Sequence, residues 1–187
     1  VDWRHMKELL NAGGDVFDEL KNVCVWTKTN GGMGSLYRSQ HELVFVYKRG
    51  AAAHLNNVEL GRFGRNRTNV WAYAGVNTFK SGRDAELAMH PTVKPVALIH
   101  DALKDVTKRG AIVLDPFGGS GSTLIAAEKC GRSARLIEID PLYCDVIIKR
   151  FQDFTGKSST LEGSDKTFEE MRSLRGAESA GAQGGAD

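Results

Sequence analysis

Residues 111–123 read AIVLDPFGGSGST, and this stretch decides the fold of the chain. Its first four residues are apolar, a pattern typical of a parallel strand buried on both faces. Pro116 ends the strand, and the glycines after it provide backbone that can turn sharply and approach a ligand closely. Residues 122–130 then have a helical pattern that Gly131 closes. The stretch therefore predicts a strand, a glycine-rich turn and a helix N-terminus, an arrangement typical of nucleotide sites.

A second strand is predicted over residues 133–140, with acidic residues at its carboxyl end. Glu138 is the better candidate to accept hydrogen bonds from both hydroxyls of a ribose. Asp140 precedes Pro141 and is predicted to cap the next helix. The glycine spacing matches neither the dinucleotide fingerprint nor the phosphate-binding loop, so the turn alone is also compatible with a simple tight connection. The acidic second strand is what favours a nucleotide site.

Three motifs in a fixed order carry a family resemblance: HPTVKP at 90–95, DPFGGSGST at 115–123 and IEIDPLYCD at 137–145. They resemble the cofactor half of bacterial DNA amino-methyltransferases, which methylate N6 of adenine or N4 of cytosine. The order is that of the class whose catalytic motif comes first and whose cofactor motifs come last. The resemblance extends to about Leu174 and implies an α/β fold, with a Rossmann-like methyltransferase sheet that has helices on both faces.

The resemblance also implies a cofactor and its ligands. The cofactor would be S-adenosyl-L-methionine, with no metal ion. Thr92 and Lys94 would contact its methionine end, and Glu138 its ribose. The remaining implied cofactor-binding residues are Asp115, Pro116, Phe117, Gly118, Gly119, Ser120, Gly121 and Asp140.

Two further stretches are assigned to double-stranded DNA by the same resemblance. Residues 26–50 match the loop that lines the target-base pocket in the family, where Tyr37 and Arg38 would contact the flipped base. Residues 49–89 are rich in basic and amide side chains, as expected of a small target-recognition segment. Its candidate DNA contacts are Arg62, Arg65 and Arg67. Taken by themselves, both stretches are also compatible with strand caps and a solvated loop.

The family's catalytic tetrapeptide, D/N/S-P-P-Y/F, does not occur in this chain. In this motif order it would precede Val1, so we expect the N-terminal catalytic segment to be absent and the fragment alone to be inactive. The sheet would then be incomplete beside residues 111–114, and a missing segment or a complementing chain would fill the gap. The expected organisation is a core part bordering the base pocket (1–48), a recognition part (49–89), a cofactor part (90–175) and a disordered tail (176–187).

Two other readings remain open from the sequence. The first is a non-catalytic DNA-binding or regulatory module built on a degenerate cofactor fold. The second, a dehydrogenase-like nucleotide binder, is disfavoured by the HPTVKP turn and by the lack of a second βαβ half. If the chain is an enzyme, we expect adenine N6 in preference to cytosine N4 as the methylated group.

Length and composition constrain the number of domains, the partners and the compartment less tightly than the motifs do. With 187 residues the chain is expected to be one domain, and a net charge of +2 permits nucleic-acid binding without arguing for it. Its three cysteines are expected to be buried free thiols, as in a reducing compartment. No apolar run approaches the roughly 18 residues of a membrane span, so we expect a cytoplasmic protein without a membrane partner, in which a homodimer is possible.

The hydrophobic pattern predicts the remaining elements. Residues 1–5 are expected to be the tail of a strand, followed by a helix over 6–12 that Gly13 and Gly14 stop. Further predicted elements are strands at 20–27 and 41–48, helices at 96–106 and 141–154, a short third strand at 159–162, and a last helix at 166–174.

Overall fold

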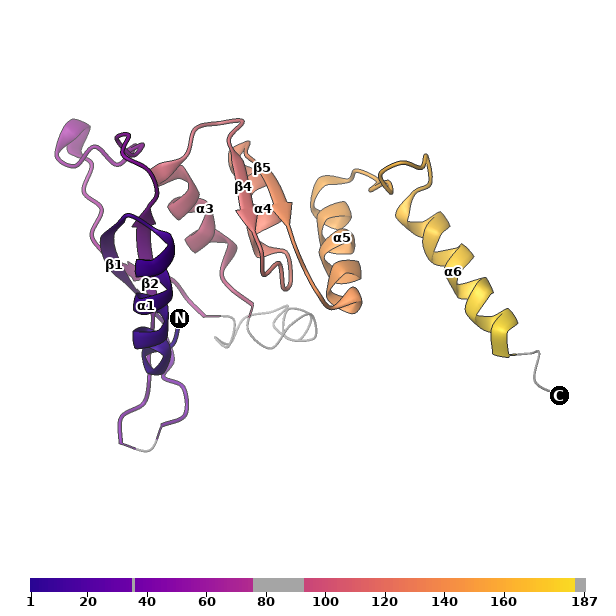
Figure 1. Ribbon diagram of the computed structural model, residues 1–187, viewed down its shortest axis with the longest axis horizontal. Coiled ribbons are helices and arrows are strands. Elements are labelled where there is room, and N and C mark those ends of the chain that lie inside the picture. The colour runs from indigo at the N-terminus through magenta and orange to yellow at the C-terminus, as the bar shows by residue number, and fades with distance from the viewer. Residues whose placement is uncertain (35, 76–92, 184–187) are drawn as a thin grey trace.

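The computed structural model describes residues 1–34, 36–75 and 93–183, the last eight of these by their backbone alone. This part of the chain forms a mixed α/β structure with two small sheets (Figure 1). In chain order the elements are η1 (Trp3–His5), α1 (Met6–Val16), β1 (Glu19–Thr27), β2 (His41–Lys48), η2 (Arg62–Gly64), β3 (Val70–Ala72), α3 (Val96–Val106), β4 (Ile112–Asp115), α4 (Ser122–Cys130), β5 (Ser133–Leu136), α5 (Pro141–Thr155) and α6 (Phe168–Gln183).

The first sheet has the order β2-β1-β3, in which β1 is antiparallel to β2 and parallel to β3. The two longer strands confirm the predictions for residues 20–27 and 41–48. Their side chains alternate between two covered faces. On one face Tyr47 stacks on Phe17, with 5.1 Å between ring centroids, and donates a hydrogen bond to the carbonyl of Leu9 in α1. On the other face Trp26 and Cys24 are buried.

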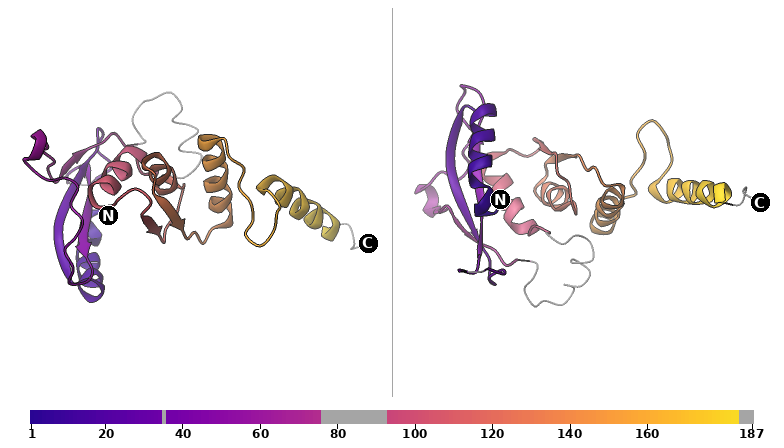
Figure 2. Two further views of the ribbon diagram at one scale, coloured as in Figure 1. Left: turned by 90° about the horizontal axis from the view of Figure 1, so that it is seen from above. Right: turned by 60° about the horizontal axis from the view of Figure 1, so that its bottom comes forward.

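Helix α3 covers that second face and connects the two sheets. Leu98 of α3 packs with Cys24, Trp26 and Trp71 in a buried cluster, with further partly buried apolar side chains around it. The opposite side of α3 packs against α4, so the helix lies between the first sheet and the second (Figure 2). The helix predicted at 96–106 is thereby confirmed, together with its role in the core.

The second sheet is the pair β4 and β5, which run parallel from Ile112 opposite Ser133 to Asp115 opposite Leu136. Helix α4 ends at Gly131, which has a φ of 69° as the predicted C-cap requires. Helix α5 begins at Pro141 behind the predicted Asp140 cap, whose side chain accepts from the amide of Leu142 at 2.8 Å. The strand, turn and helix units predicted around residues 111–154 are therefore confirmed in kind and order, although the second strand is shorter than predicted.

The burial predicted for β4 is wrong. Ile112 and Leu114 are 69% and 65% exposed, while Val113 and Asp115 are partly covered. Within the described residues β4 pairs with β5 on one side only, and one face of the pair lacks a covering layer. The exposed alternate positions agree with the expectation of an incomplete sheet.

The predicted N-terminal elements also need correction. Residues 3–5 form a single 3-10 turn capped by Asp2, not the tail of a strand. Helix α1 continues through Gly13 and Gly14 to Val16 instead of stopping there. Gly13 is buried against Tyr47, and a Cβ on it would lie 2.3 Å from the Tyr47 ring. The glycine therefore lets the helix approach β2 closely and does not end it.

Three predictions toward the C-terminus are also wrong in extent. Strand β5 ends at Leu136, and the carbonyl of the next residue, Ile137, accepts a hydrogen bond from the amide of Gly118 in the glycine turn. Residues 159–162 contribute only an isolated bridge between Thr160 and Thr167. Helix α6 runs to Gln183 and projects away from the rest of the chain (Figure 1), so disorder from residue 176 does not hold as far as Gln183. Residues 184–187 lie outside the described part.

Two expectations about the chain as a whole can be compared with the structure. All three cysteines are free, with Cys24 and Cys130 buried and Cys144 partly buried. Among the described helices, none combines the length and the apolar character that crossing a membrane requires.

Candidate functional site: a cavity beside the glycine turn

The predicted glycine turn connects β4 to α4 and is held by its own hydrogen bonds. The side chain of Asp115 accepts from the amide of Phe117 at 3.0 Å. The amide of Gly118 donates to the carbonyl of Ile137 at 2.9 Å, which fastens the turn to the end of β5. Gly119 and Gly121 have φ values of 53° and 77°, in the left-handed region that favours glycine. The turn is therefore a specific backbone structure that a side-chain-bearing residue would strain.

The Gly118 position is also restricted by packing. A Cβ on Gly118 would lie 3.1 Å from Ile147 of α5 and 3.3 Å from Leu136 of β5. The guanidinium of Arg150, also on α5, donates to the carbonyl and hydroxyl of Ser120 and to the hydroxyl of Ser122, at 3.0–3.2 Å. Helix α5 thus supports the turn from behind, and sequence reasoning missed the contribution of Arg150.

Glu138 joins the turn to the chain that follows β5. One carboxylate oxygen accepts from the amide of Gly119 at 2.6 Å, and the other accepts from the amide of Asp140 at 3.0 Å. A carboxylate offers about four lone-pair sites and can therefore accept several hydrogen bonds at once. The structure therefore places Glu138 at the turn, which its carboxylate helps to hold, and its contact with a ribose stays a prediction.

A cavity of about 570 Å³ opens beside the turn. Its walls come from the turn, from the residues after β5, and from the segment that enters α3. It is lined by Lys94, Ile99, Asp115, Pro116, Phe117, Gly118, Gly119, Ser120, Ser122, Thr123, Ile137, Glu138 and Ile139. Eight of the predicted cofactor residues thus share one hollow, although they belong to segments that are separated in the sequence.

The remaining predicted cofactor residues lie elsewhere. Gly121 begins α4, and a Cβ on it would meet Ile147 at 3.2 Å. Asp140 caps α5 with its side chain and meets Glu138 through its amide. Thr92 lies outside the described residues.

Lys94 reaches the cavity from the connection that precedes α3. Its ammonium lies 3.3 Å from one oxygen of Glu42, and the ammonium of Lys28 lies 2.5 Å from the other. Burial opposes ionisation of Glu42, but the two neighbouring ammonium groups outweigh it and hold the pKa of the carboxyl below its usual value. Both lysines also lie over the ring of Trp26. Sequence reasoning did not single out Glu42 as a site residue and missed this cluster.

The residues predicted to contact the flipped base lie on the loop between β1 and β2. Tyr37 is 85% exposed. Arg38 folds back on its own loop, where its guanidinium donates to the carbonyls of Gly31 and Gly32 at 2.7 and 3.2 Å. The cavity beside the glycine turn is lined by neither of them, so the structure does not bring them together with the cofactor candidates.

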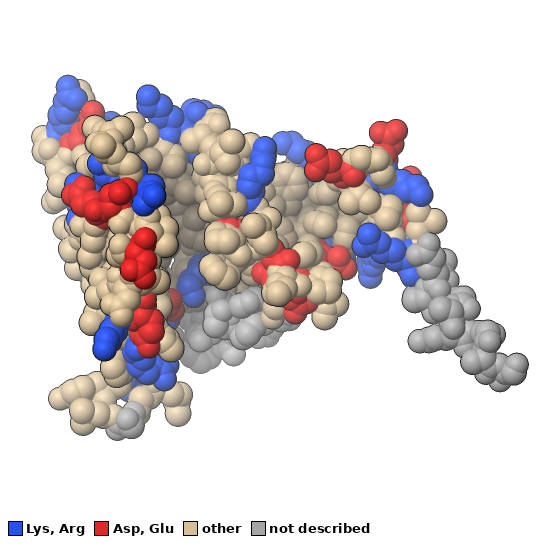
Figure 3. Space-filling view, in the orientation of Figure 1, with Lys and Arg blue, Asp and Glu red and all other residues tan. Residues whose placement is uncertain are grey.

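The three arginines predicted to contact DNA fall into two environments. Arg62 and Arg65 are exposed and both pair with Glu59 on the same loop, at 3.1 and 2.9 Å. Arg67 instead pairs with Asp105 of α3 and lies over the ring of Trp71, 4.8 Å from its centroid. Basic and acidic side chains are mixed over the visible face of the molecule (Figure 3). The first two arginines are solvent-exposed and pair within their own loop, whereas Arg67 pairs with a helix inside the fold.

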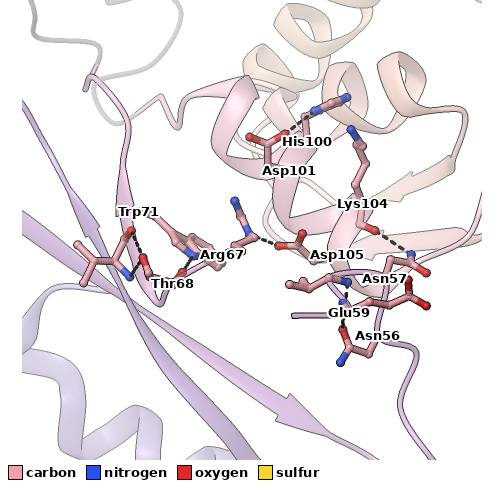
Figure 4. A network of polar contacts seen from close by, with 12 residues as sticks. Asn56, Asn57, Glu59, Arg67, Thr68, Trp71, His100, Asp101, Lys104 and Asp105 are labelled. Carbon is pink, nitrogen blue, oxygen red and sulfur yellow. Dashed lines mark hydrogen bonds and ion pairs between the residues drawn. The ribbon is translucent and has the colours of Figure 1, made fainter. Parts of the chain in front are cut away.

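Arg67 belongs to a polar network between residues 49–75 and α3 (Figure 4). Tyr73 donates to Asp101 of α3 at 2.7 Å. The side-chain amide of Asn57 donates to the carbonyls of Lys104 and Thr107, both at 2.8 Å, and thereby satisfies the C-terminal end of the helix. Burial raises the pKa of Asp105 despite its arginine partner. Nothing in the local sequence signals these partners, because they are about 30 to 50 residues apart.

The strand, the glycine turn, the helix N-terminus and the acidic residue just after the next strand define a Rossmann-like nucleotide-binding fold. A model of the N6/N4 family described as "DNA methylase" matches residues 1–150. The chain therefore belongs to the N6/N4 DNA methylase family, as the sequence motifs indicate.

Individual relatives agree with the family. The type II methyltransferase M.HinfI of Haemophilus influenzae is 27% identical over 163 residues, which are 87% of this chain and 41% of the relative. M.ScaI of Streptomyces caespitosus is 35% identical over 89 residues, 48% of this chain and 29% of the relative. M2.DpnII of Streptococcus pneumoniae is 31% identical over 144 residues, 73% and 52% respectively. The chain thus spans about half, or less, of the length of these curated relatives.

Solved structures with the same fold include the M1.HpyAVI–SAM complex, with a TM-score of 0.63 and 24% identity over 81% of this chain and 71% of that chain. The PvuII DNA methyltransferase, described as cytosine-N4-specific, has a TM-score of 0.61 and 18% identity over 80% of this chain and 56% of that one. At these identities the likeness establishes the Rossmann-like methyltransferase fold.

Proposed function

We propose that this chain forms the S-adenosylmethionine-binding and DNA-recognition part of an enzyme that methylates adenine N6 or cytosine N4 in double-stranded DNA. The observation that carries the proposal is the convergence of the glycine turn, Glu138 and Lys94 on one cavity. These residues offer what the cofactor needs: backbone close to the nucleoside, an acceptor for ribose hydroxyls and a cation for the methionine carboxylate.

In this proposal Glu138 accepts hydrogen bonds from the ribose hydroxyls in addition to those from the amides of Gly119 and Asp140. The residues from Asp115 to Ser120 line the nucleoside, and Lys94 and Thr92 face the methionine end. Asp140 and Gly121 act indirectly, by fixing the starts of α5 and α4. The cavity volume of about 570 Å³ is within the usual range for a ligand of this size.

On the DNA side, Arg62 and Arg65 are the proposed phosphate contacts and Tyr37 a proposed stacking surface for the flipped base. Arg38 would have to leave its present backbone partners to take part. Transfer of the methyl group would be in line from the sulfonium to the amino nitrogen, accelerated by positioning of the two reactants.

The catalytic tetrapeptide would come from a segment or chain that completes the sheet beside β4. Support for this comes from the exposed Ile112 and Leu114 and from the unpaired edge of β4 within the described residues. Alone, the chain would bind cofactor without transferring the methyl group. The absence of the tetrapeptide also favours a second candidate, a DNA-binding module that retains the cofactor fold without catalysis.

The test has two stages. Calorimetric titration with S-adenosylmethionine, S-adenosylhomocysteine and NAD should detect binding of the first two only. Methyl transfer from labelled cofactor is then assayed on duplexes containing adenine or cytosine targets. The assay is run with the chain alone and with the catalytic segment of a relative added. Cofactor binding without any labelled DNA in either mixture would favour the non-catalytic module, and preferential binding of NAD would refute both.

A further inference from the structure

The carboxylate of Glu42 lies between two lysines that come from different parts of the chain. Its oxygens lie 2.5 Å from the ammonium of Lys28, at the end of β1, and 3.3 Å from that of Lys94, before α3. The Glu42 side chain is 18% exposed, so the pair is shielded from water more than an ordinary surface ion pair. A shielded carboxylate with two cationic partners fixes their positions more firmly than an exposed one.

Lys94 is the partner that matters for the site, because it lines the cavity beside the glycine turn whereas Glu42 does not. Lys94 is 43% exposed and lies 5.9 Å from the ring centroid of the buried Trp26. A lysine on a loop has many rotamers, and binding a ligand would require it to lose that freedom. Glu42 restricts those rotamers before a ligand arrives.

We propose that Glu42 is a positioning residue for the cofactor: it holds the ammonium of Lys94 at the wall of the cavity, where the charged amino-acid end of S-adenosylmethionine would lie. This inference rests on the proposed function. It also ties cofactor binding to the β1–β2 hairpin, because Glu42 and Lys28 both belong to that hairpin while Lys94 belongs to the cavity wall.

The charge of Glu42 sets the direction of the effect. S-adenosylmethionine carries a sulfonium in addition to its ammonium and carboxylate, whereas S-adenosylhomocysteine lacks the sulfonium charge. Removing the carboxylate leaves two ammonium groups uncompensated beside the cavity, which disfavours the more cationic ligand. Releasing Lys94 weakens both ligands, because both have the amino-acid end. The affinity for 5′-methylthioadenosine, which lacks the amino-acid end, should not change when the carboxylate of Glu42 is removed.

The experiment compares the 187-residue chain with its Glu42→Gln, Lys94→Met and Glu19→Gln variants by calorimetry with these three ligands. Glu19→Gln is the control, since Glu19 pairs with Lys21 at 2.8 Å on the same hairpin, away from the cavity. Glu42→Gln should weaken S-adenosylmethionine about 5- to 20-fold, S-adenosylhomocysteine less, and 5′-methylthioadenosine not at all. The double variant Glu42→Gln/Lys94→Met should bind little more weakly than Lys94→Met alone.

A second readout does not depend on cofactor binding. The acetylation rate of Lys94 by an amine-reactive reagent, followed by mass spectrometry, should at least double in Glu42→Gln and stay unchanged in Glu19→Gln. An unchanged rate at Lys94 overturns the positioning role. Equal weakening of all three ligands, or additive effects in the double variant, also overturns it. Failure of the unaltered chain to bind any of the three ligands refutes the proposed function instead.

Discussion

Substituting Glu138 by glutamine tests its two proposed roles, holding the glycine turn and accepting the ribose hydroxyls. In the structure both carboxylate oxygens accept from backbone amides, those of Gly119 and Asp140. Glutamine keeps one acceptor oxygen and replaces the other by an NH₂ group, which cannot accept. One backbone hydrogen bond is therefore removed, and with it an acceptor for a ribose hydroxyl. Both the stability of the turn and the affinity for the nucleoside should fall.

The expected loss of stability is smaller than the expected loss of binding free energy. A hydrogen bond to a charged group contributes about 1.5–3 kcal/mol, and Glu138 is only partly buried, so we expect a stability decrease of about 1 kcal/mol in urea unfolding. Removing a ribose acceptor should cost about 1–3 kcal/mol of binding, which is about 5- to 150-fold in the dissociation constant. A matched control is Glu128→Gln on α4, because Glu128 pairs with Lys157 and does not line the cavity.

Ligand analogues then test the ribose assignment itself. Calorimetry compares S-adenosylhomocysteine with its 2′-deoxy and 3′-deoxy analogues in both forms of the chain. If Glu138 accepts the ribose, the analogues bind more weakly than the parent to the unaltered chain, and the difference shrinks in Glu138→Gln. The reasoning is refuted if the unaltered chain binds all three equally, or if the penalty for a missing hydroxyl is the same in both forms.

Further substitutions test the other regions. The double variant Arg62→Ala/Arg65→Ala should lower DNA affinity and reduce the slope of log affinity against log salt concentration by about 0.9 for each phosphate that is no longer neutralised. Arg67→Gln should instead lower the melting temperature and leave this slope unchanged. Equal slopes for both variants and the unaltered chain would contradict the assignment of Arg62 and Arg65, but not Arg67, to DNA. Asn57→Ala should cost about 1–2 kcal/mol in urea unfolding, because two carbonyls of α3 are left without their donor, and Asn57→Asp should not restore it. The pKa of Glu42 is lowered in the folded state, so its ionised carboxylate stabilises the fold above the usual glutamate pKa, and this stabilisation disappears on acidification. Glu42→Gln should therefore be less stable than the parent near neutral pH and equally stable in acid, as measured by urea unfolding. A difference in stability that persists in acid would exclude the charge of Glu42 as its cause.

The parts of the fold that sequence could predict are those whose causes are local. The strand, glycine turn and helix over residues 111–131 are determined by apolar runs, a proline and glycines within a few residues of each other. The cap at Asp140 and the C-cap at Gly131 follow from the same neighbourhood. The convergence of Glu138 on the turn could also be predicted, because the carboxyl ends of adjacent parallel strands meet at one edge of the sheet.

The parts that sequence could not predict depend on partners far along the chain. Gly13 looks like a helix stop until the ring of Tyr47 is placed against it. Glu42 lies near the start of β2, and its neighbours in the sequence do not reveal that it pairs with Lys94, which is about 50 residues further along the chain. Arg67 has the sequence context of a surface arginine, but in the structure it pairs with Asp105 and lies over the ring of Trp71. In each case the role of the residue depends on a contact partner that is distant in the sequence, so the local pattern could not predict that role.

Helix α3 provides a physical reason why the two proposed binding regions occur in one structure. The carbonyl of Thr107, which follows α3, accepts from the side chain of Asn57 at 2.8 Å and from that of Arg132 at 2.6 Å. Asn57 belongs to the segment assigned to DNA, and Arg132 follows α4 in the cofactor part. At the other end of the helix, Lys94 lines the cavity and pairs with Glu42. A displacement of the 49–75 segment therefore either carries α3 with it or breaks these hydrogen bonds. Because α3 also packs on α4, the two regions share one support, and any coupling of DNA and cofactor affinity through it must act equally in both directions.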